Sequence, residues 1–168
     1  MSGNYQLGGF FPTTIWNSSA SLMQLDLSKV NFSGNLPESL GYLTSLQSLT
    51  LFFCNLLGPI PKSLWNLTRI VSMANCTELE VLDLGNNNLN DTFPIWLGTL
   101  PELRVLILRS NKFHRPVRAS SSTRLFPQLQ MIDLSCNAFT AELPTSLFQD
   151  LKGMRRIDQT MKAPSDGA

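Results

Sequence analysis

Residues that could carry out chemistry are few in this sequence, and none stands at a spacing that a reaction needs. His114 is the only histidine, and it has no catalytic partner at an informative spacing. The three cysteines, at positions 54, 76 and 136, lack the close spacing of metal-ligating thiolates. No glycine-rich nucleotide loop and no kinase signature occurs. The sequence therefore predicts a protein that is not an enzyme and that holds no metal or cofactor.

Charged side chains offer two further candidates. Asp26, Asp83 and Asp133 recur at equivalent places of a repeating pattern, so we expect a row of surface carboxylates rather than a catalytic set. The stretch from Arg104 to Arg124 holds six of the 13 basic residues and no acidic one. It could be a patch for nucleic acid or an acidic partner, but its irregular, Ser-rich part favours a solvated loop. With a net charge of +1, no nucleic-acid binding is predicted.

Five Asn-x-Ser/Thr sequons mark potential glycan acceptors, at Asn17, Asn31, Asn66, Asn75 and Asn90. A sequon is glycosylated only in a protein that enters the secretory pathway. Residues 1–16 show no basic start followed by an apolar run, so no secretory signal is visible there. We therefore expect occupied sequons in a full-length, secreted relative.

Leucines define the elements that must position these residues. The chain has 29 leucines, and a Leu-x-x-Leu-x-Leu pattern begins at residues 22, 46, 79, 103 and 129, with Ile132 in place of the second leucine of the last copy. The last two leucines of each copy alternate with other residues, which is typical of a strand with one buried face. No uninterrupted apolar run of about 20 residues occurs, so no membrane span is predicted. Five such copies in register are typical of a leucine-rich repeat.

A further position recurs three residues after the last leucine of each copy. It holds Cys54, Asn87, Asn111 and Asn137 in the last four copies. A small polar side chain there can satisfy backbone groups where the chain turns out of the strand. These four residues are predicted to form a buried structural ladder. A later Gly and Pro in most copies suit a tight bend and an edge.

The predicted fold is an α/β solenoid of leucine-rich repeats. Parallel strands stack into a concave sheet, and short 3-10 helices or loops form the convex side. Neither end carries a cap, so we expect apolar surface to be exposed there. The predicted coils span residues 22–45, 46–70, 79–102, 103–128 and 129–153, with partial coils at 2–21 and 154–168 and an irregular junction at 71–78.

The concave face is the predicted binding surface, because residues that flank the buried leucines point outward from it. Phe52, followed by Phe53, is an aromatic residue without a duty in folding, and Arg109 is the nearest charged residue of a type suited to an interface. Aromatic and arginine side chains are the usual anchors of protein interfaces. The predicted contacts are Phe52, Phe53, Arg109, Asp83 and Asp133.

The 33-residue step between the second and third copies is irregular. Residues 63–70 and 72–79 both read as the closing third of a coil, yet only Val71 separates them. This likeness favours a deletion that joined two coils of a longer repeat protein; the alternative is a loop inserted into an intact array. Pairing of Leu49–Leu51 beside Leu82–Leu84 would favour the loop.

The repeat resembles a known family. The Leu-x-Gly-x-Ile-Pro element, as in Leu56-Leu-Gly-Pro-Ile-Pro61, resembles the plant extracellular class, which adds a second short strand to each coil. Residues 79–165 resemble the membrane-proximal repeats of plant receptor-like proteins, in particular the Cf-type fungal-resistance proteins. The resemblance implies a fragment of an ectodomain on the extracellular face of the plasma membrane. It also implies a microbial protein ligand, a partner receptor kinase, and anchoring by a transmembrane helix that this chain lacks.

Three functions follow as alternatives. The first is a non-enzymatic binding module from a receptor-like protein in pathogen recognition and defence signalling. The second is a secreted inhibitor of a microbial cell-wall hydrolase, similar to the polygalacturonase inhibitors. The third is a truncated product without function. The sequence does not name the ligand, since specificity would lie in the exposed residues.

Overall fold

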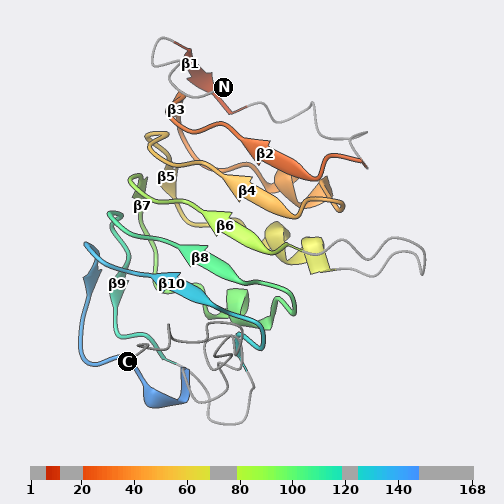
Figure 1. Cartoon of the computed structure of the whole chain (residues 1–168). Helices are drawn as coiled ribbons and strands as arrows, with labels where there is room; N and C mark the ends of the chain where they lie inside the picture. Colours follow the sequence, from red (N-terminus) through yellow and green to blue (C-terminus); the bar gives the residue numbers. More distant parts are fainter. Residues whose placement is uncertain (1–6, 12–20, 69–78, 119–124, 148–168) are drawn as a thin grey trace, which may run out of the picture.

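The main sheet of the solenoid consists of five parallel strands, one from each complete coil. The computed structural model describes residues 7–11, 21–68, 79–118 and 125–147 of the chain. Within these residues the strands stack in chain order, one beside the next (Figure 1). They are β2 (Gln24–Asp26), β4 (Ser48–Thr50), β6 (Val81–Asp83), β8 (Val105–Ile107) and β10 (Met131–Asp133). Each strand coincides with a predicted leucine pattern.

A second series of short strands follows the first around each coil. Parallel pairs join β1 to β3, β5 to β7 and β9 to β11, and isolated bridges at Asn35–Leu57 and Thr92–His114 continue the stack between these pairs. These strands are β1 (Gly8–Phe10), β3 (Asn31–Ser33), β5 (Leu57–Gly58), β7 (Asn88–Leu89), β9 (His114–Arg115) and β11 (Ala138–Phe139). A second strand per coil is the feature expected of the plant extracellular class.

Short 3-10 helices close the described coils on the convex side. They are η2 (Glu38–Tyr42), η3 (Lys62–Thr68), η4 (Ile95–Thr99) and η5 (Thr145–Leu147). Neighbouring helices pack very closely, since a Cβ on Gly41 of η2 would collide with the backbone carbonyl of Ser63 in η3. The glycine after the coil-closing leucine therefore allows one coil to lie directly on the next.

The core is a column of leucines with an aromatic cluster near its carboxyl-terminal end. Leu49, Leu82 and Leu106, at the centres of their strands, have no exposed surface. Phe113 and Phe126 are also fully buried, and the ring of Phe113 stacks on Phe139 with centroids 6.2 Å apart. Neither Phe113 nor Phe126 belongs to the predicted leucine pattern. Phe113 and Phe126 therefore both reach the interior of the coil at 103–128, one before and one after residues 119–124, which lie outside the described residues.

The array is continuous across the 33-residue step. β4 and β6 pair in parallel, and Leu49 lies opposite Leu82 as Leu82 lies opposite Leu106 in the next pair. This is the pairing that favours an inserted loop over a deletion. Residues 71–78, the predicted junction, lie outside the described residues.

Apolar side chains are exposed at both ends of the described array. At the amino-terminal end Leu7 is 56% and Phe10 is 84% exposed, and at the other end Met131 and Leu143 are 49% and 42% exposed. Among the described residues no helix is both long enough and apolar enough to span a bilayer.

Candidate functional site

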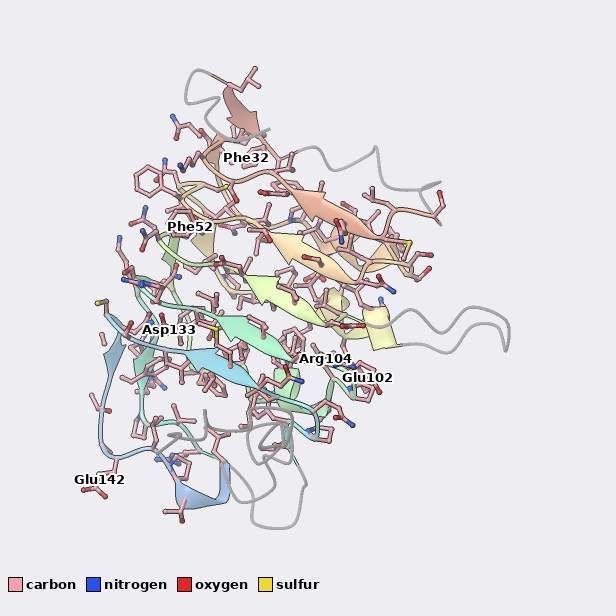
Figure 2. All side chains as sticks on the ribbon, in the orientation of Figure 1. Phe32, Phe52, Glu102, Arg104, Asp133 and Glu142 are labelled. Atoms are coloured by element: carbon pink, nitrogen blue, oxygen red, sulfur yellow. The ribbon has the colours of Figure 1, made fainter. Side chains whose placement is uncertain are left out.

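Three neighbouring coils present Phe52, Gly85 and Arg109 at equivalent outward positions of the concave face, and we call the position of Gly85, which carries no side chain, the notch. The strand register places these residues side by side, because Thr50 pairs with Asp83 and Asp83 with Ile107, two residues earlier in each coil. Phe52 is half-buried and Arg109 is exposed, while Gly85 between them is buried. A Cβ on Gly85 would lie 3.3 Å from Cγ of Arg109, so the arginine stem borders the notch. Phe52 and Asp133 both lie at the carboxyl-terminal ends of their strands (Figure 2).

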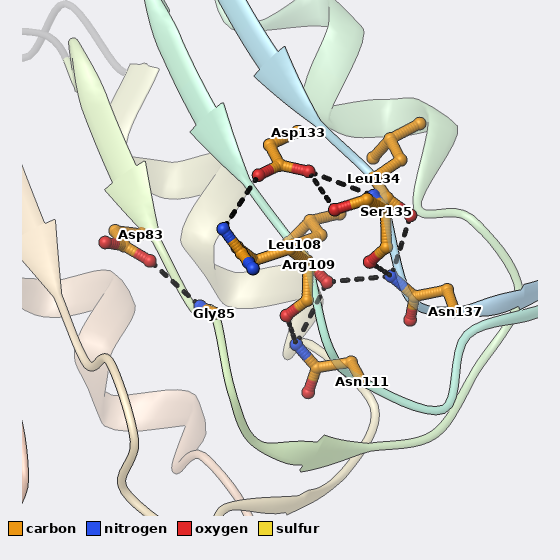
Figure 3. Close-up of polar contacts among 9 residues, drawn as sticks. All are labelled: Asp83, Gly85, Leu108, Arg109, Asn111, Asp133, Leu134, Ser135 and Asn137. Atoms are coloured by element: carbon orange, nitrogen blue, oxygen red, sulfur yellow. Dashed lines mark hydrogen bonds and ion pairs between the residues drawn. The ribbon is translucent and has the colours of Figure 1, made fainter.

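Arg109 is held loosely by one carboxylate. Its Nη1 lies 3.7 Å from Oδ2 of Asp133, and the two side chains are 49% and 24% exposed. The other oxygen of Asp133 accepts hydrogen bonds from the Ser135 amide at 3.0 Å and the Ser135 hydroxyl at 2.6 Å (Figure 3). The hydroxyl bond, followed by the amide bond, lowers the pKa of Asp133. Most of the guanidinium donors of Arg109 thus remain available to a ligand.

Asp83 lies beside the notch, and its carboxyl group is partly removed from solvent. Burial raises the pKa of this carboxyl group, against the opposing effect of the Gly85 amide, which donates to Oδ1 at 2.9 Å. Asp26 makes the same contact with the Ser28 amide, and its pKa is lowered by hydrogen bonds from Ser28. By accepting hydrogen bonds from backbone amides two residues later, the recurring aspartates stabilise the turns that follow the strands. Among the described residues no hydrogen bond joins two of these aspartates, and they form a row along the sheet.

The asparagine positions form a buried ladder beneath this surface. Asn87 accepts hydrogen bonds from the amides of Cys54 and Leu56 at 2.9 and 3.1 Å and donates to the carbonyls of Leu51 and Leu84 at 2.8 and 3.0 Å. Asn111 and Asn137 repeat the pattern one coil further each: both donate to the Leu108 carbonyl, at 3.0 and 2.9 Å respectively (Figure 3). Each ladder residue therefore bonds its own coil and the preceding one.

Cys54 occupies the same ladder position with a thiol. Its Sγ lies 3.1 Å from the Leu27 carbonyl of the preceding coil, and burial raises the pKa of the thiol. A protonated thiol in such surroundings is a weak donor with little reactivity. In the preceding coil the amides of Val30 and Phe32 donate to backbone carbonyls instead. Cys54 therefore does not have to accept hydrogen bonds from the preceding coil, as the amide oxygen of asparagine does in the later coils.

Phe53 lies beside the concave face rather than on it. Its backbone is left-handed, with φ of 57°, and its side chain is 53% exposed. The ring lines a hollow between the main sheet and the second strands, not the notch at Gly85. The sequence missed this hollow, although the recurrence of Asn31, Asn55 and Asn88 one residue after the ladder position could have revealed it. The hollow is lined by Lys29, Asn31, Phe53, Asn55, Asn86 and Asn88.

Three of the predicted sequons lie among the described residues. Asn31 begins β3 and is exposed, Asn66 is half-buried on η3, and Asn90 is exposed just after β7. Asn17 and Asn75 lie outside the described residues. Exposed side chains at Asn31 and Asn90 are accessible to a glycosylating enzyme.

The remaining chemical candidates lie apart from the notch. His114 Nδ1 is 3.3 Å from the Lys112 carbonyl within its own turn, and Cys136 is exposed. Arg104 pairs with Glu80 at 3.3 Å and more distantly with Glu102 at the amino-terminal side of the strands (Figure 2). Within the described ranges no three His, Cys, Asp or Glu residues gather as a metal site. The described part of the basic stretch thus divides between the concave face at Arg109, the ion pair of Arg104 and a turn, and Arg124 lies outside the described residues.

Comparisons with known proteins agree with the repeat and its class. Sequence profiles of the leucine rich repeat match residues 62–113 in one form and residues 21–43 and 45–67 in another. Receptor-like protein 34 of Arabidopsis thaliana is 40% identical over 149 residues, which cover 89% of this chain and 14% of that protein. The chain thus spans only a small part of the length of such relatives.

Solved structures of plant receptors share the fold. The plant peptide hormone receptor RGFR1, in complex with RGF2, is 31% identical with a TM-score of 0.73 over 88% of this chain and 22% of that one. The Arabidopsis receptor kinase HAESA, in complex with the peptide hormone IDA and the co-receptor SERK1, is 31% identical with a TM-score of 0.70. That match covers 83% of this chain and 22% of that one.

Proposed function

Because the chain belongs to the leucine-rich repeat family and, within it, to the plant receptor-like proteins, we propose that its concave face binds a peptide or protein ligand as part of a longer ectodomain. The observation that carries this proposal is the notch at Gly85. An aromatic ring on one side and a guanidinium on the other are the two side-chain types that dominate binding energy at protein interfaces. They stand in fixed register on neighbouring coils, so binding costs little ordering of the receptor.

The notch also indicates what kind of group it accepts. Among the described residues Arg109 has one carboxylate partner, at 3.7 Å, and its side chain is about half exposed, so it can bind a ligand carboxylate through two parallel hydrogen bonds. Phe52 offers an apolar surface beside it. A peptide segment with an apolar side chain next to an acidic group or a terminal carboxylate fits both. Asp133 limits this attraction, because the ligand must compete with it for Arg109.

The wider role follows from the relatives. The two receptors that share the fold are described in complex with peptide hormones, and one of them with a co-receptor. We infer that the complete protein is held at the plasma membrane with its repeats outside the cell, and that it acts by binding rather than catalysis. It senses a microbial protein, as the Cf-type resemblance predicts, and signals through a partner receptor kinase. The hydrolase inhibitor and the truncated product stay predictions of the sequence, with no specific contact in their favour.

Selection from a displayed library of random peptides tests the proposal. The full 168-residue chain serves as the target, and selected peptides are measured against variants by calorimetry. We expect Phe52→Ala and Arg109→Ala each to weaken binding by at least about 10-fold. Tyr42→Ala on the convex side and Lys112→Ala outside the sheet are matched controls and leave the affinity within about 2-fold. Selected peptides that ignore Phe52 and Arg109, or a target that enriches none, would overturn the assignment of the concave face.

A further inference from the structure

The hollow beside the concave face is built as two rows that run across three coils. The inner row, Lys29, Phe53 and Asn86, has left-handed backbone with φ of 65°, 57° and 53°. The outer row is Asn31, Asn55 and Asn88, two residues further along each coil. Together the two rows line a hollow of about 400 Å3. It therefore combines one exposed aromatic ring with four amide side chains.

Hydrogen bonds join the three side-chain amides of the outer row, and each bond is donated toward the preceding coil. Asn88 Nδ2 donates to Asn55 Oδ1 at 3.0 Å, and Asn55 Nδ2 donates to Asn31 Oδ1 at 3.3 Å. The chain of bonds thus ends on the oxygen of Asn31. The Nδ2 of Asn31 has no hydrogen-bond partner among the described residues. That nitrogen is the atom that carries the sugar in an N-linked glycan.

Packing in the core does not explain the position of the Phe53 ring. A left-handed backbone is disfavoured for a bulky residue, and the ring is 53% exposed. Its ring lies near that of Phe52, with centroids 6.3 Å apart. An exposed aromatic ring beside hydrogen-bonding amides suits a ligand that has an apolar face and a polar rim. A sugar ring has both, since its C–H groups gather on one face and its hydroxyls lie around the edge.

We propose that Asn31 is N-glycosylated and that the first sugar of its glycan packs into this hollow, against the ring of Phe53. Asn86 and Asn88 then hydrogen-bond the hydroxyl and acetamide groups of that sugar. Asn31 lies in a sequon completed by Ser33, and both residues are exposed on β3. This inference rests on the proposed function, because glycan transfer requires that the complete protein enters the secretory pathway.

The covalent step needs one co-reactant, a lipid diphosphate-linked oligosaccharide supplied by the host. Asn31 Nδ2 forms a bond to C1 of the first sugar, and the bond from C1 to the diphosphate oxygen breaks. The lipid diphosphate leaves, and one proton of the amide nitrogen is released. No oxidation or reduction occurs. Asn31 keeps its Oδ1, so the bond from Asn55 survives the modification.

The chain offers a comparison site without this hollow. Asn90 is also exposed in a sequon, but it does not line the hollow that holds Phe53. A glycan there lacks the aromatic contact. The seated glycan at Asn31 covers the side of the solenoid and leaves the notch at Gly85 free. The effect of the glycan on Tm can be measured without a peptide ligand.

Thermal unfolding of the full chain, secreted from a eukaryotic host behind a cleavable signal, tests the proposal. Glycopeptide mass spectrometry first measures occupancy at Asn31. Ser33→Ala removes the sequon and retains the Asn31 side chain, so it isolates the glycan. We expect the glycan at Asn31 to raise Tm by roughly 2–4 °C, the shift caused in a chain of this length by a contact comparable to an aromatic pair. Trimming to a single sugar with an endoglycosidase should preserve that rise.

The contact with Phe53 is tested by a double-variant cycle. In Phe53→Ala the rise in Tm due to the glycan should fall below about 1 °C, while in Tyr42→Ala, an exposed aromatic control elsewhere, it should persist. Removal of the Asn90 sequon by Thr92→Ala should leave the coupling unchanged. An unoccupied Asn31, or an equal glycan effect with and without the Phe53 ring, overturns the proposal. Neither result depends on peptide binding, so it stands apart from the test of the proposed function.

Discussion

Replacement of Asn87 by alanine should be among the most damaging single changes to this fold. The side chain is 8% exposed and joins two coils. Without it the carbonyls of Leu84 and Gly85 keep other donors, namely the side chain of Asn111 and the amide of Phe53. The amides of Cys54 and Leu56 and the Leu51 carbonyl lose the partner that Asn87 supplied. At about 1 kcal/mol or more for each unsatisfied group, Asn87→Ala should cost about 3 kcal/mol.

Urea unfolding followed by circular dichroism measures this loss. The midpoint should fall with little change in the slope, since the surface exposed on unfolding is unchanged. Asn88→Ala is the matched control: it removes one exposed amide contact from the adjacent position and should cost less than about 0.5 kcal/mol. Equal losses for the two variants, or a loss below about 1 kcal/mol for Asn87→Ala, would refute the reasoning about the ladder.

Three further changes test the packing and the charges. Gly41→Ala should cost about 1–3 kcal/mol in urea unfolding, because its Cβ meets a rigid backbone carbonyl, whereas Gly85→Ala should cost less because it meets movable side chains. Phe113→Ala should cost about 3–5 kcal/mol, and a loss under 1 kcal/mol would contradict its place in the core. Asp83 has a raised pKa, so its ionised form destabilises the fold at pH 7; Asp83→Asn should raise Tm at pH 7, and the gain should vanish as the pH falls through that pKa. Asp133 has a lowered pKa, so Asp133→Asn should lower Tm at pH 7, with a difference that shrinks below the unfolded value of about 4.

The repeat made most of the fold predictable. The leucine pattern determines which residues face the core, so the five strands fall where the pattern places them. The position three residues further predicts the ladder, because a turn out of a buried strand needs a side chain that both donates and accepts. Phe113 and Phe126 were missed for a physical reason. The sequence between them departs from the repeat pattern, so the pattern does not indicate that the residues on both sides reach the same core.

Less of the candidate site than of the fold could be predicted from the sequence. Phe52 and Arg109 can be assigned to the concave face by counting from the leucines. The notch also depends on Gly85 between them, and a glycine at an outward position does not by itself indicate a binding site. Phe53 was placed on the same face because it follows Phe52. Its backbone is left-handed and its ring lines the side hollow, which the leucine pattern does not indicate.

Nuclear Overhauser contacts between β4 and β6 test the central claim most directly, namely that one continuous concave face crosses the 33-residue step and brings Phe52 beside Gly85 and Arg109. The structure predicts backbone contacts between Leu49 and Leu82 as clear as those between Leu82 and Leu106, which serve as an internal control. Contacts present between β6 and β8 but absent between β4 and β6 would contradict the claim. The binding face would then divide into two separate arrays.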